Sequence, residues 1–496
     1  YKRQGYTTLA SFGSSQAVTF SNVATLSDAE MSYGSSNLSE NYNASTIAGT
    51  ADAVKLTLQG QSAGTFAATG VETVTVISKG STSGSSTTAV AVNNTNSLKT
   101  LNITGDQKVF LSVTDNSVTK VDASTATAAV SVDVTTAVAN TDISIVGSAT
   151  DDIITIGVLG TADTVDGGAG NDTLVFTGNT GSTALTKVTG FEKVQLTASS
   201  AGAAFTVDTS VVSGVSTFIA NLTDTTNDAT AVAVTFSKFS DTGALELTKS
   251  TQTDFTGDGN TVTVTSATNT TTNSFSGTLS GIGNSATLGL ASLTADNAET
   301  INLTSNTNSD ATVTSNLVLS LASNDAKTVN LTGAASLPIT AVNLPNATKI
   351  DASGLTKNFM IDAGANSIAR TITGGAGNDT LEAGSGNDTI NGGAGNDVIV
   401  TGGGADSIVA GDGNDTVYVG TAAAYTVTFN GGTAPTPTYS TSSQLVNLSG
   451  GAGNDTFNFD ESGISYQDTI NGGDDTDTVV INSNASGTTL TATGAS

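Results

Sequence analysis

Cysteine, histidine and tryptophan are all absent from the 496 residues of this chain. Without cysteine the chain has no disulfide and no thiolate nucleophile, and without histidine it has no Ser-His-Asp triad. A zinc site built from His or Cys is excluded for the same reason. Asp, Glu, Lys, Ser and Tyr could still form a catalytic site, but no constellation of them stands out. We therefore expect that the protein is not an enzyme.

Basic residues are also scarce. The chain has 15 Lys and Arg against 43 Asp and Glu, which gives a formal net charge of -28 at pH 7. Nucleic acids and anionic lipids carry charge of the same sign, so we expect neither as a partner. No apolar run approaches the ~20 residues of a membrane-spanning helix, so we also expect no membrane insertion.

Proline is rare, with 4 residues, and aromatic residues make up 5% of the chain. Few prolines leave the backbone N–H groups available for sheets, and the frequent Thr and Val favour strands. Short segments with alternating apolar residues, such as 74–76 and 261–265, are separated by Gly/Asn/Asp/Ser clusters. Helical periodicity is weak, and Ser27 to Met31 is its one candidate. The pattern predicts an all-β fold.

One short phrase recurs along the chain. A charged residue is followed by apolar residues two positions apart, and most copies end in Thr. The copies begin at Glu72, Lys99, Glu192, Glu299 and Lys327. Spacings of about 20 to 30 residues suit one coil of a β-solenoid, in which successive coils stack their strands in parallel. The phrases therefore predict a parallel β-solenoid.

Two longer blocks match each other in order. Lys99–Gly105 leads to Thr119–Ser124, Lys327–Gly333 leads to Thr348–Ser353, and each block runs into a segment rich in Gly and Asp. This order predicts two similar tandem halves. We divide the chain into a β segment that could join subunits (1–70), a first solenoid half with a short glycine-aspartate turn (71–200), a β-rich connecting domain (201–290), a second half with the main array (291–425) and a C-terminal β domain (426–496).

The stretch from Gly374 to Tyr418 repeats every nine residues and reads GGAGNDTLE, AGSGNDTIN, GGAGNDVIV, TGGGADSIV and AGDGNDTVY. Each unit divides into a six-residue turn and a three-residue strand. The glycines permit the positive φ that such a tight turn needs. Two units then form one coil, with a turn on each flank. The central residue of each strand is expected to enter a thin core: Leu381, Ile390, Ile399, Ile408 and Val417.

The fixed step places the aspartates of alternate units above one another, at the strand spacing of ~4.8 Å. Asp379 then lies one coil below Asp397, Asp397 below Asp415, and Asp388 below Asp406. Two carboxylates ~5 Å apart repel by about 1 kcal/mol in water and by more near a protein surface. A divalent cation between the coils would turn this repulsion into attraction. Calcium fits, because it takes about 6–8 oxygens in flexible geometry, whereas magnesium prefers a tighter octahedron.

The predicted calcium sites comprise the acids and turn residues of the array and of its copies. In the array these are Asp379, Asp388, Asp397, Asp406, Asp415, Gly374, Gly375, Gly377, Asn378, Gly384, Gly386, Asn387, Gly393, Gly395, Asn396 and Gly413. In the copies they are Asp172, Gly168, Gly170, Asp455, Gly451, Gly453, Asp468 and Asp477. The fourth unit has Ala405 in place of Asn, and Asp254–Asn260 fits a plain hairpin turn as well as a cation turn.

The nonapeptide resembles the G-G-x-G-x-D-x-U-x repeat of RTX proteins, which form calcium-bound parallel β-rolls. Secreted toxins, proteases, lipases, adhesins and surface-layer proteins share such repeats. The proteases resemble metzincins and the lipases use a histidine partner, so both are excluded by the lack of histidine. Pore-forming toxins have long apolar helices, and none is visible here.

The remaining class is the surface-layer (S-layer) proteins of Caulobacter and Campylobacter type, which this Thr/Ser/Ala/Gly-rich chain resembles. The resemblance implies a structural protein that is exported by type I secretion to the bacterial cell surface. There it self-assembles into a two-dimensional lattice held by calcium. It further implies an N-terminal anchor to cell-surface polysaccharide. Because the chain opens with Tyr1 and no signal peptide, we expect this segment to be missing or the anchor to be different.

An RTX-type extracellular adhesin or filament subunit is the alternative. Its stretch up to Val71 would then be the joining segment. A carbohydrate-active β-helix enzyme ranks last, because Glu is scarce and most Asp residues lie in turn motifs.

Overall fold

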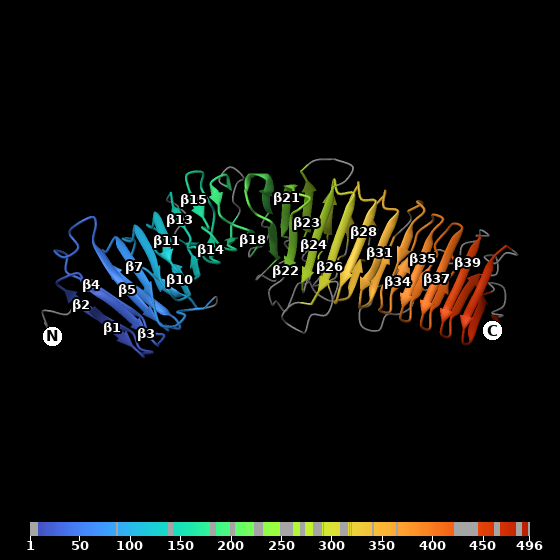
Figure 1. The fold of residues 1–496 in the computed structure, drawn as a ribbon, viewed down its shortest axis with the longest axis horizontal. Helices are drawn as coiled ribbons and strands as arrows, with labels where there is room; N and C mark the ends of the chain where they lie inside the picture. Colours follow the sequence, from blue (N-terminus) through green and yellow to red (C-terminus); the bar gives the residue numbers. More distant parts are fainter. Residues whose placement is uncertain are drawn as a thin grey trace. The chain divides into compact units, whose positions relative to one another are not determined.

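The computed structural model describes residues 8–85, 88–136, 142–178, 185–198, 204–222, 232–248, 261–267, 273–280, 290, 292–307, 316, 318, 320–339, 342–363, 366–420, 445–460, 467–482 and 489–494. Nearly all elements are β-strands (Figure 1), and the 3-10 helix η2 (Thr209–Val211) is a short exception. The predicted all-β fold is confirmed. The helix candidate at Ser27 to Met31 is wrong, because Asp28–Ser32 is strand β3, in which Ala29 and Met31 alternate toward the core.

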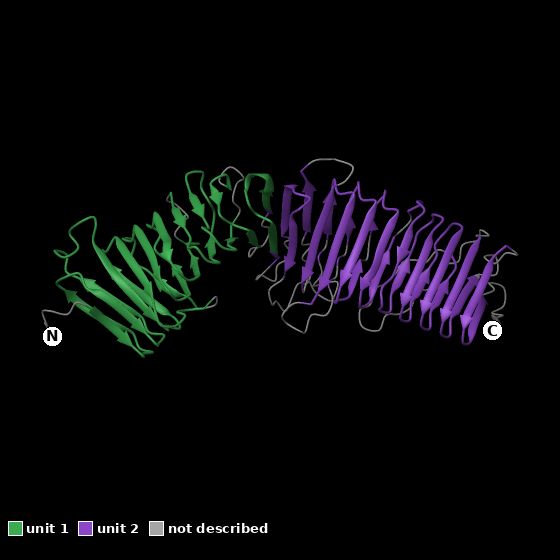
Figure 2. Cartoon of the chain, viewed as in Figure 1, with its two compact units in different colours: residues 1–198, 205–220 green, residues 199–204, 221–496 purple. Residues whose placement is uncertain are grey.

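The chain divides into two compact units (Figure 2). Unit 1 comprises residues 1–198 and 205–220, and unit 2 comprises residues 199–204 and 221–496. The sequence pattern predicts five segments, and the structure groups their strands into these two units.

Unit 1 is built from two parallel sheets whose strands alternate along the chain. One sheet has nine strands: β1 (Thr8–Phe12), β3 (Asp28–Ser32), β5 (Ala53–Gln59), β7 (Thr73–Ser78), β9 (Thr100–Gly105), β11 (Lys120–Ala126), β13 (Ser144–Val146), β15 (Thr164–Asp166) and β17 (Val188–Thr189). The other contains β2 (Val18–Val23), β4 (Leu38–Tyr42), β6 (Gly64–Thr69), β8 (Val90–Val92), β10 (Val109–Val113), β12 (Val130–Asp133), β14 (Ile153–Ile156), β16 (Thr173–Phe176) and β18 (Lys193–Ala198). Strands β19 (Ala204–Asp208) and β20 (Thr217–Leu222) follow.

Unit 2 continues the same alternation. Its longest ladder contains β22 (Ala244–Thr248), β24 (Ser274–Ser280), β26 (Thr300–Asn306), β28 (Thr328–Gly333), β31 (Lys349–Leu355), β33 (Thr371–Thr373), β35 (Thr389–Ala394), β37 (Asp406–Asp412), β39 (Val446–Ala452) and β41 (Thr469–Asp474). A second contains β21 (Ala233–Phe239), β23 (Thr261–Ser266), β25 (Ser292–Asp296), β27 (Leu321–Ala322) and β30 (Val342–Asn343). The third contains β29 (Leu337–Ile339), β32 (Phe359–Asp362), β34 (Thr380–Glu382), β36 (Val398–Val400), β38 (Thr416–Tyr418), β40 (Thr456–Asp460), β42 (Asp477–Asn482) and β43 (Thr489–Gly494).

Pairing between coils is parallel throughout the described ladders, except that β43 runs antiparallel to β42. The register stacks apolar residues on each other, so that Val74 pairs with Leu101 and Leu101 with Val121. All three side chains are 0% exposed. Because side chains in a strand point alternately to its two faces, the intervening Thr and Asn residues face outward. The predicted parallel β-solenoid is confirmed.

The two matching blocks fold alike. The ion pairs Lys120–Asp122 and Lys349–Asp351 both measure 2.9 Å between nitrogen and oxygen. In each block a serine two residues after the aspartate donates its hydroxyl to Oδ1 over 2.6 Å. Both strands also shift register against the strand before them at this point. The second block therefore repeats the first in its side-chain contacts as well as in its sequence.

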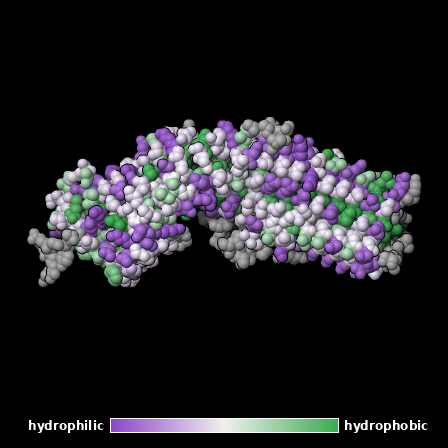
Figure 3. Space-filling view, viewed as in Figure 1, coloured by the Kyte–Doolittle hydropathy of each residue, from purple (hydrophilic) through white to green (hydrophobic). Residues whose placement is uncertain are grey.

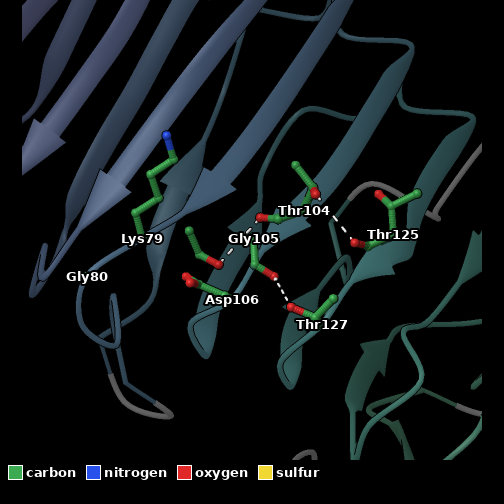
Figure 4. A pocket seen from close by; sticks show the side chains of 8 residues that line it. Lys79, Gly80, Thr104, Gly105, Asp106, Thr125 and Thr127 are labelled. Carbon is green, nitrogen blue, oxygen red and sulfur yellow. Dashed lines mark hydrogen bonds between the residues drawn. The ribbon is translucent and has the colours of Figure 1, made fainter.

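Thr127 and Thr356 show the same agreement at the coil corners. The Thr127 hydroxyl donates to the carbonyl oxygen of Gly105 over 3.1 Å, and Thr356 donates to Gly333 over 3.4 Å. Figure 4 shows the first of these corners. A pocket at this corner is lined by Ser78, Lys79, Gly80, Thr104, Gly105, Asp106, Thr125 and Thr127. Hydroxyl-to-carbonyl bonds of this kind link successive coils where the strands end.

Candidate metal centre

The nine-residue array folds into coils of two units each. Strand β34 pairs with β36, and β35 pairs with β37, so each strand lies against the strand two units further along the chain. Leu381 and Ile399 pair in register and are 0% exposed. The six-residue turns between the strands therefore stack on two flanks.

The aspartates of one flank form a column, which we call the first Asp column. It consists of Asp379, Asp397, Asp415, Asp455 and Asp477. Each of these side chains reaches back to the preceding coil, where its Oδ1 accepts a backbone N–H. The distance is 2.7 Å from the Asp379 nitrogen to Asp397 and 2.7 Å from the Asp397 nitrogen to Asp415. The Asp415 and Asp455 nitrogens donate to the next aspartate over 2.9 and 3.0 Å.

On the other flank, Asp388 and Asp406 form the second Asp column, with 2.9 Å between the Asp388 nitrogen and Asp406 Oδ1. The preceding coil has Arg370 in this position, and its N–H donates to Asp388 Oδ1 over 2.7 Å. The following coil has Val446, which pairs with Asp406 and donates its N–H to Asp468 over 3.1 Å. Asp468 is therefore separated from Asp406 by a coil without an acid at this corner.

The second carboxylate oxygen of most of these aspartates, Oδ2, accepts no hydrogen bond. Oδ2 is buried and has no hydrogen-bond partner in Asp172, Asp388, Asp397, Asp406, Asp415 and Asp455. The residues themselves are 0 to 3% exposed. Burying an ionised oxygen without a partner is costly. These oxygens therefore require a cation or a proton.

The turn glycines bring the backbone of successive coils into close contact. A Cβ on Gly393 would collide with the carbonyl oxygen of Gly375, and a Cβ on Gly395 would collide with that of Gly377. Gly393 and Gly395 also have positive φ, 109° and 112°, which disfavours any other residue. A Cβ would meet backbone of the adjoining coil in the same way at Gly168, Gly170, Gly374, Gly386, Gly413, Gly451 and Gly453. Glycine thus lets the peptide oxygens of one turn approach the next.

The asparagines link the coils in the opposite direction. Asn396 and Asn414 donate their N–H groups to the side-chain oxygens of Asn378 and Asn396, over 2.9 and 2.8 Å. Ala405 donates to Asn387 over 2.9 Å. The replacement of Asn by Ala in this unit therefore keeps the donor and removes only the acceptor for the following coil. These asparagine oxygens are engaged by amides, and a role for them as metal ligands stays a prediction.

Carboxylate and peptide oxygens do lie close together between the coils: a Cβ on Gly392 would meet both Asp397 Oδ2 and the carbonyl oxygen of Ala410, and a Cβ on Gly450 would meet both Asp455 Oδ2 and the carbonyl oxygen of Gly472. Calcium prefers such ligands and accepts about 6–8 of them in variable geometry. The residues present therefore fit calcium. The Oδ2 atoms of stacked aspartates and the glycine carbonyls would hold the ion. Its charge would compensate the carboxylates that the interior otherwise leaves without a counter-charge.

Burial shifts the titration of both columns. Together with the charges of Asp379 and Asp415, it raises the pKa of Asp397 to about 8. It also raises the pKa of Asp406 to about 7 and that of Asp379 to about 6. Without metal, the folded state therefore binds protons that the unfolded chain, with its ordinary aspartate pKa of 3.8, has already released.

Stability of the metal-free array is therefore expected to fall as the pH rises from about 5 to about 8, because the folded state binds more protons in this window. Saturating calcium should remove or reverse this dependence, since calcium competes with protons for the carboxylates. Thermal unfolding followed by circular dichroism, on protein freed of metal over a chelating resin, measures both slopes. A metal-free array whose melting temperature rises over the same window would contradict this assignment of the buried carboxylates.

Unit 1 contains a shorter acidic column that the sequence pattern reveals only in part. Asp172 is 0% exposed, and its Oδ1 accepts the Asp152 N–H over 2.7 Å. Its own N–H donates to Glu192 Oε2 over 2.8 Å. Asp152 and Glu192 are not among the predicted site residues. The available signal is Gly147, which precedes Asp152 by the same interval as Gly167 precedes Asp172.

The glutamates with which some of the recurring phrases begin connect successive coils by hydrogen bonds. Glu72 Oε2 accepts the Asp52 N–H over 2.9 Å, and Glu299 Oε2 accepts the Asn273 N–H over 2.9 Å. Glu192 does the same for Asp172. Acidic side chains thus accept an N–H of the preceding coil at several places in this solenoid. The Asp columns make the same contact where the turns are rich in glycine. The suggested cation turn at Asp254–Asn260 lies outside the described residues.

Comparison with protein families agrees with this geometry. A model of the RTX calcium-binding nonapeptide repeat matches residues 160–176, 371–399, 391–422 and 447–461. The chain carries RTX repeats. Such repeats bind Ca²⁺, so calcium is the metal of this chain's repeats, and its place between the stacked aspartates stays a prediction. A search among curated proteins finds no match to the chain.

The match covers both units, since residues 160–176 include Asp172 of unit 1. The same model matches the array and the separate copy at 447–461, which contains Asp455. Asp152 precedes the matched residues, and Asp468 and Asp477 follow them. Their stacking is visible only in the hydrogen bonds between coils.

Proposed function

We propose that the protein is a calcium-dependent structural protein of the bacterial cell surface that self-assembles into a two-dimensional S-layer lattice. The observation that supports this role is the pair of Asp columns, in which buried carboxylates of successive coils need calcium to compensate their charge. The proposed role is structural and involves no catalytic site.

Extracellular location is supported by the repeats themselves, because RTX proteins are typically secreted. Among the described residues, no helix is both long enough and apolar enough to cross a membrane. Calcium sites of extracellular modules work with dissociation constants of about 10⁻⁴ to 10⁻³ M. Secretion would therefore bring the chain into a medium in which calcium fills its repeats and the repeats fold.

Assembly of identical copies has to overcome a formal net charge of -28 per chain. Figure 3 shows a face on which hydrophilic residues are spread among neutral ones, with hydrophobic residues in small groups. Contacts between such faces depend on ions more than on apolar burial. Calcium that bridges acidic loops of neighbouring copies would convert mutual repulsion into attraction. Contacts between different faces would then propagate instead of closing.

The test compares purified protein with millimolar calcium, with millimolar magnesium and with excess EGTA. Light scattering is expected to report large particles with calcium alone, and electron microscopy to show ordered sheets. EGTA should return the particles to single chains, because the bridging charge is removed. Particle size that is the same in calcium and in EGTA would contradict the proposal.

An adhesin or filament subunit is the second candidate. Phe12 and Tyr33 favour it: their side chains are 73% and 51% exposed, and their rings meet edge to face with centroids 5.7 Å apart. Exposed aromatic pairs are typical of contact surfaces. Fibres in place of sheets in the same micrographs would support the filament, and calcium-loaded single chains that bind a surface would support the adhesin.

A further inference from the structure

Arg370 occupies a position that aspartates hold in the two following coils. Its N–H donates to Asp388 Oδ1 over 2.7 Å, as the Asp388 N–H donates to Asp406 Oδ1 over 2.9 Å. The strands that follow confirm the register, because Ile372 of β33 pairs with Ile390 of β35. A cationic residue therefore stands at the lower end of the second Asp column.

The Arg370 side chain is buried and incompletely paired. It is 2% exposed, and Nη2 donates to the carbonyl oxygen of Leu344 over 2.8 Å. Nε and Nη1 are buried and have no partner, and the same is true of Asp388 Oδ2. Although burial lowers the pKa of Arg370, the charge of Asp388 favours its protonated form. The charges of the Arg370 guanidinium and the Asp388 carboxylate thus act on each other from neighbouring coils, although the guanidinium is bonded to Leu344 and not to Asp388.

The lower end of the first Asp column is closed in another way. Asp379 accepts the Phe359 N–H at Oδ1 over 2.7 Å and the Gly375 N–H at Oδ2 over 2.6 Å. Both oxygens of this terminal aspartate are therefore satisfied by amides. Asp388, the corresponding end of the second column, has an amide at Oδ1 only. The second column lacks the closure that the first one has, and Arg370 stands at that point.

We propose that Arg370 is a built-in cation that closes the second Asp column, in the place where a further calcium ion would otherwise lie beneath Asp388. Arginine suits this role because its guanidinium keeps its charge when buried. A tethered cation is present at any calcium concentration. The first coil of the array therefore has a counter-charge before calcium binds, and the calcium sites of this flank begin between Asp388 and Asp406. The proposal rests on calcium binding by the array.

Arg370→Asp is the direct test. The new carboxylate would extend the column by one coil, so we expect about one additional calcium ion per chain at saturating calcium. Native mass spectrometry or elemental analysis of the folded protein counts the ions. Lys79→Asp, at an exposed lysine of unit 1, makes the same change in charge and should leave the count unaltered.

Arg370→Gln tests the counter-charge itself. Its melting temperature is expected to fall in metal-free buffer and to stay close to that of the parent protein in calcium, because calcium can then replace the lost charge. An equal fall in both buffers would mean that Arg370 acts only by packing, and would overturn the proposal. A calcium count unchanged by Arg370→Asp, with the strand signal retained, would also overturn it. If the parent protein itself binds no calcium, the Asp columns are not calcium sites, and the proposed function fails instead.

Discussion

Removal of calcium at neutral pH is expected to unfold the RTX coils of unit 2. At a calcium concentration of about 100 times the dissociation constant, each filled site stabilises the folded state by about 2.7 kcal/mol. The stacked pairs Asp379–Asp397, Asp397–Asp415 and Asp388–Asp406 would together contribute about 8 kcal/mol on that basis. One kcal/mol shifts the melting temperature of a domain of this size by about 2–4 °C. We therefore expect calcium to raise the melting temperature of these coils by roughly 15–30 °C.

Circular dichroism and calorimetry in calcium, in magnesium and in EGTA measure this shift. Magnesium should give a much smaller increase, because it keeps its waters and prefers octahedral geometry. The solenoid coils without glycine-rich turns are the internal reference, since their corners are held by hydroxyl and amide contacts such as Thr127 with Gly105. If EGTA leaves the calorimetric profile of the whole chain unaltered, the columns do not depend on calcium.

Asp397→Asn is expected to have opposite effects with and without calcium. The asparagine oxygen can still accept the Asp379 N–H, which now donates to Asp397 over 2.7 Å. Without metal, the folded state has to protonate or bury the Asp397 carboxylate between Asp379 and Asp415, and asparagine removes that cost, so the metal-free array should gain stability, on the order of 1–3 kcal/mol. With calcium, two adjoining sites lose a charged ligand, and a loss of about 3 kcal/mol or more is expected.

Two further variants separate the functions of the side chain. Asp397→Ala removes the hydrogen bond as well as the charge, and should destabilise the array in both conditions because the Asp379 N–H is left without a partner. Asp241→Asn changes the same charge at an exposed position of unit 2 and should have little effect in either. Thermal melts of all variants, with and without calcium, supply the comparison. A loss of stability for Asp397→Asn in metal-free buffer would show that the charge is not a source of strain there.

Much of the structure of the array could be predicted from its amino-acid sequence. A nine-residue step with an apolar residue in each short strand puts alternate units in register, so the stacking of Asp379 on Asp397 and the burial of Leu381 could be predicted. The neighbouring coil of Asp415 could not, because 40 residues separate it from Asp455. Asp152 was also missed, since Ser148 and Thr150 replace two glycines of its turn. Interrupted and degenerate repeats lose the periodic signal even where the coils still stack.

The sequence by itself determined the fold class, the repeat period, the tandem halves and calcium as the metal of the repeats. These depend on properties that act within one repeat: the alternation of strand side chains, the φ range of glycine and the chemistry of carboxylates. Only the tertiary structure decided how the two oxygens of each aspartate are used at the ends of the columns. Phe359 and Arg370 hold equivalent places at the two lower ends, yet amides satisfy both oxygens of Asp379 and only one oxygen of Asp388. The reason is that contacts between coils depend on how segments of unequal length stack, and that information is not local.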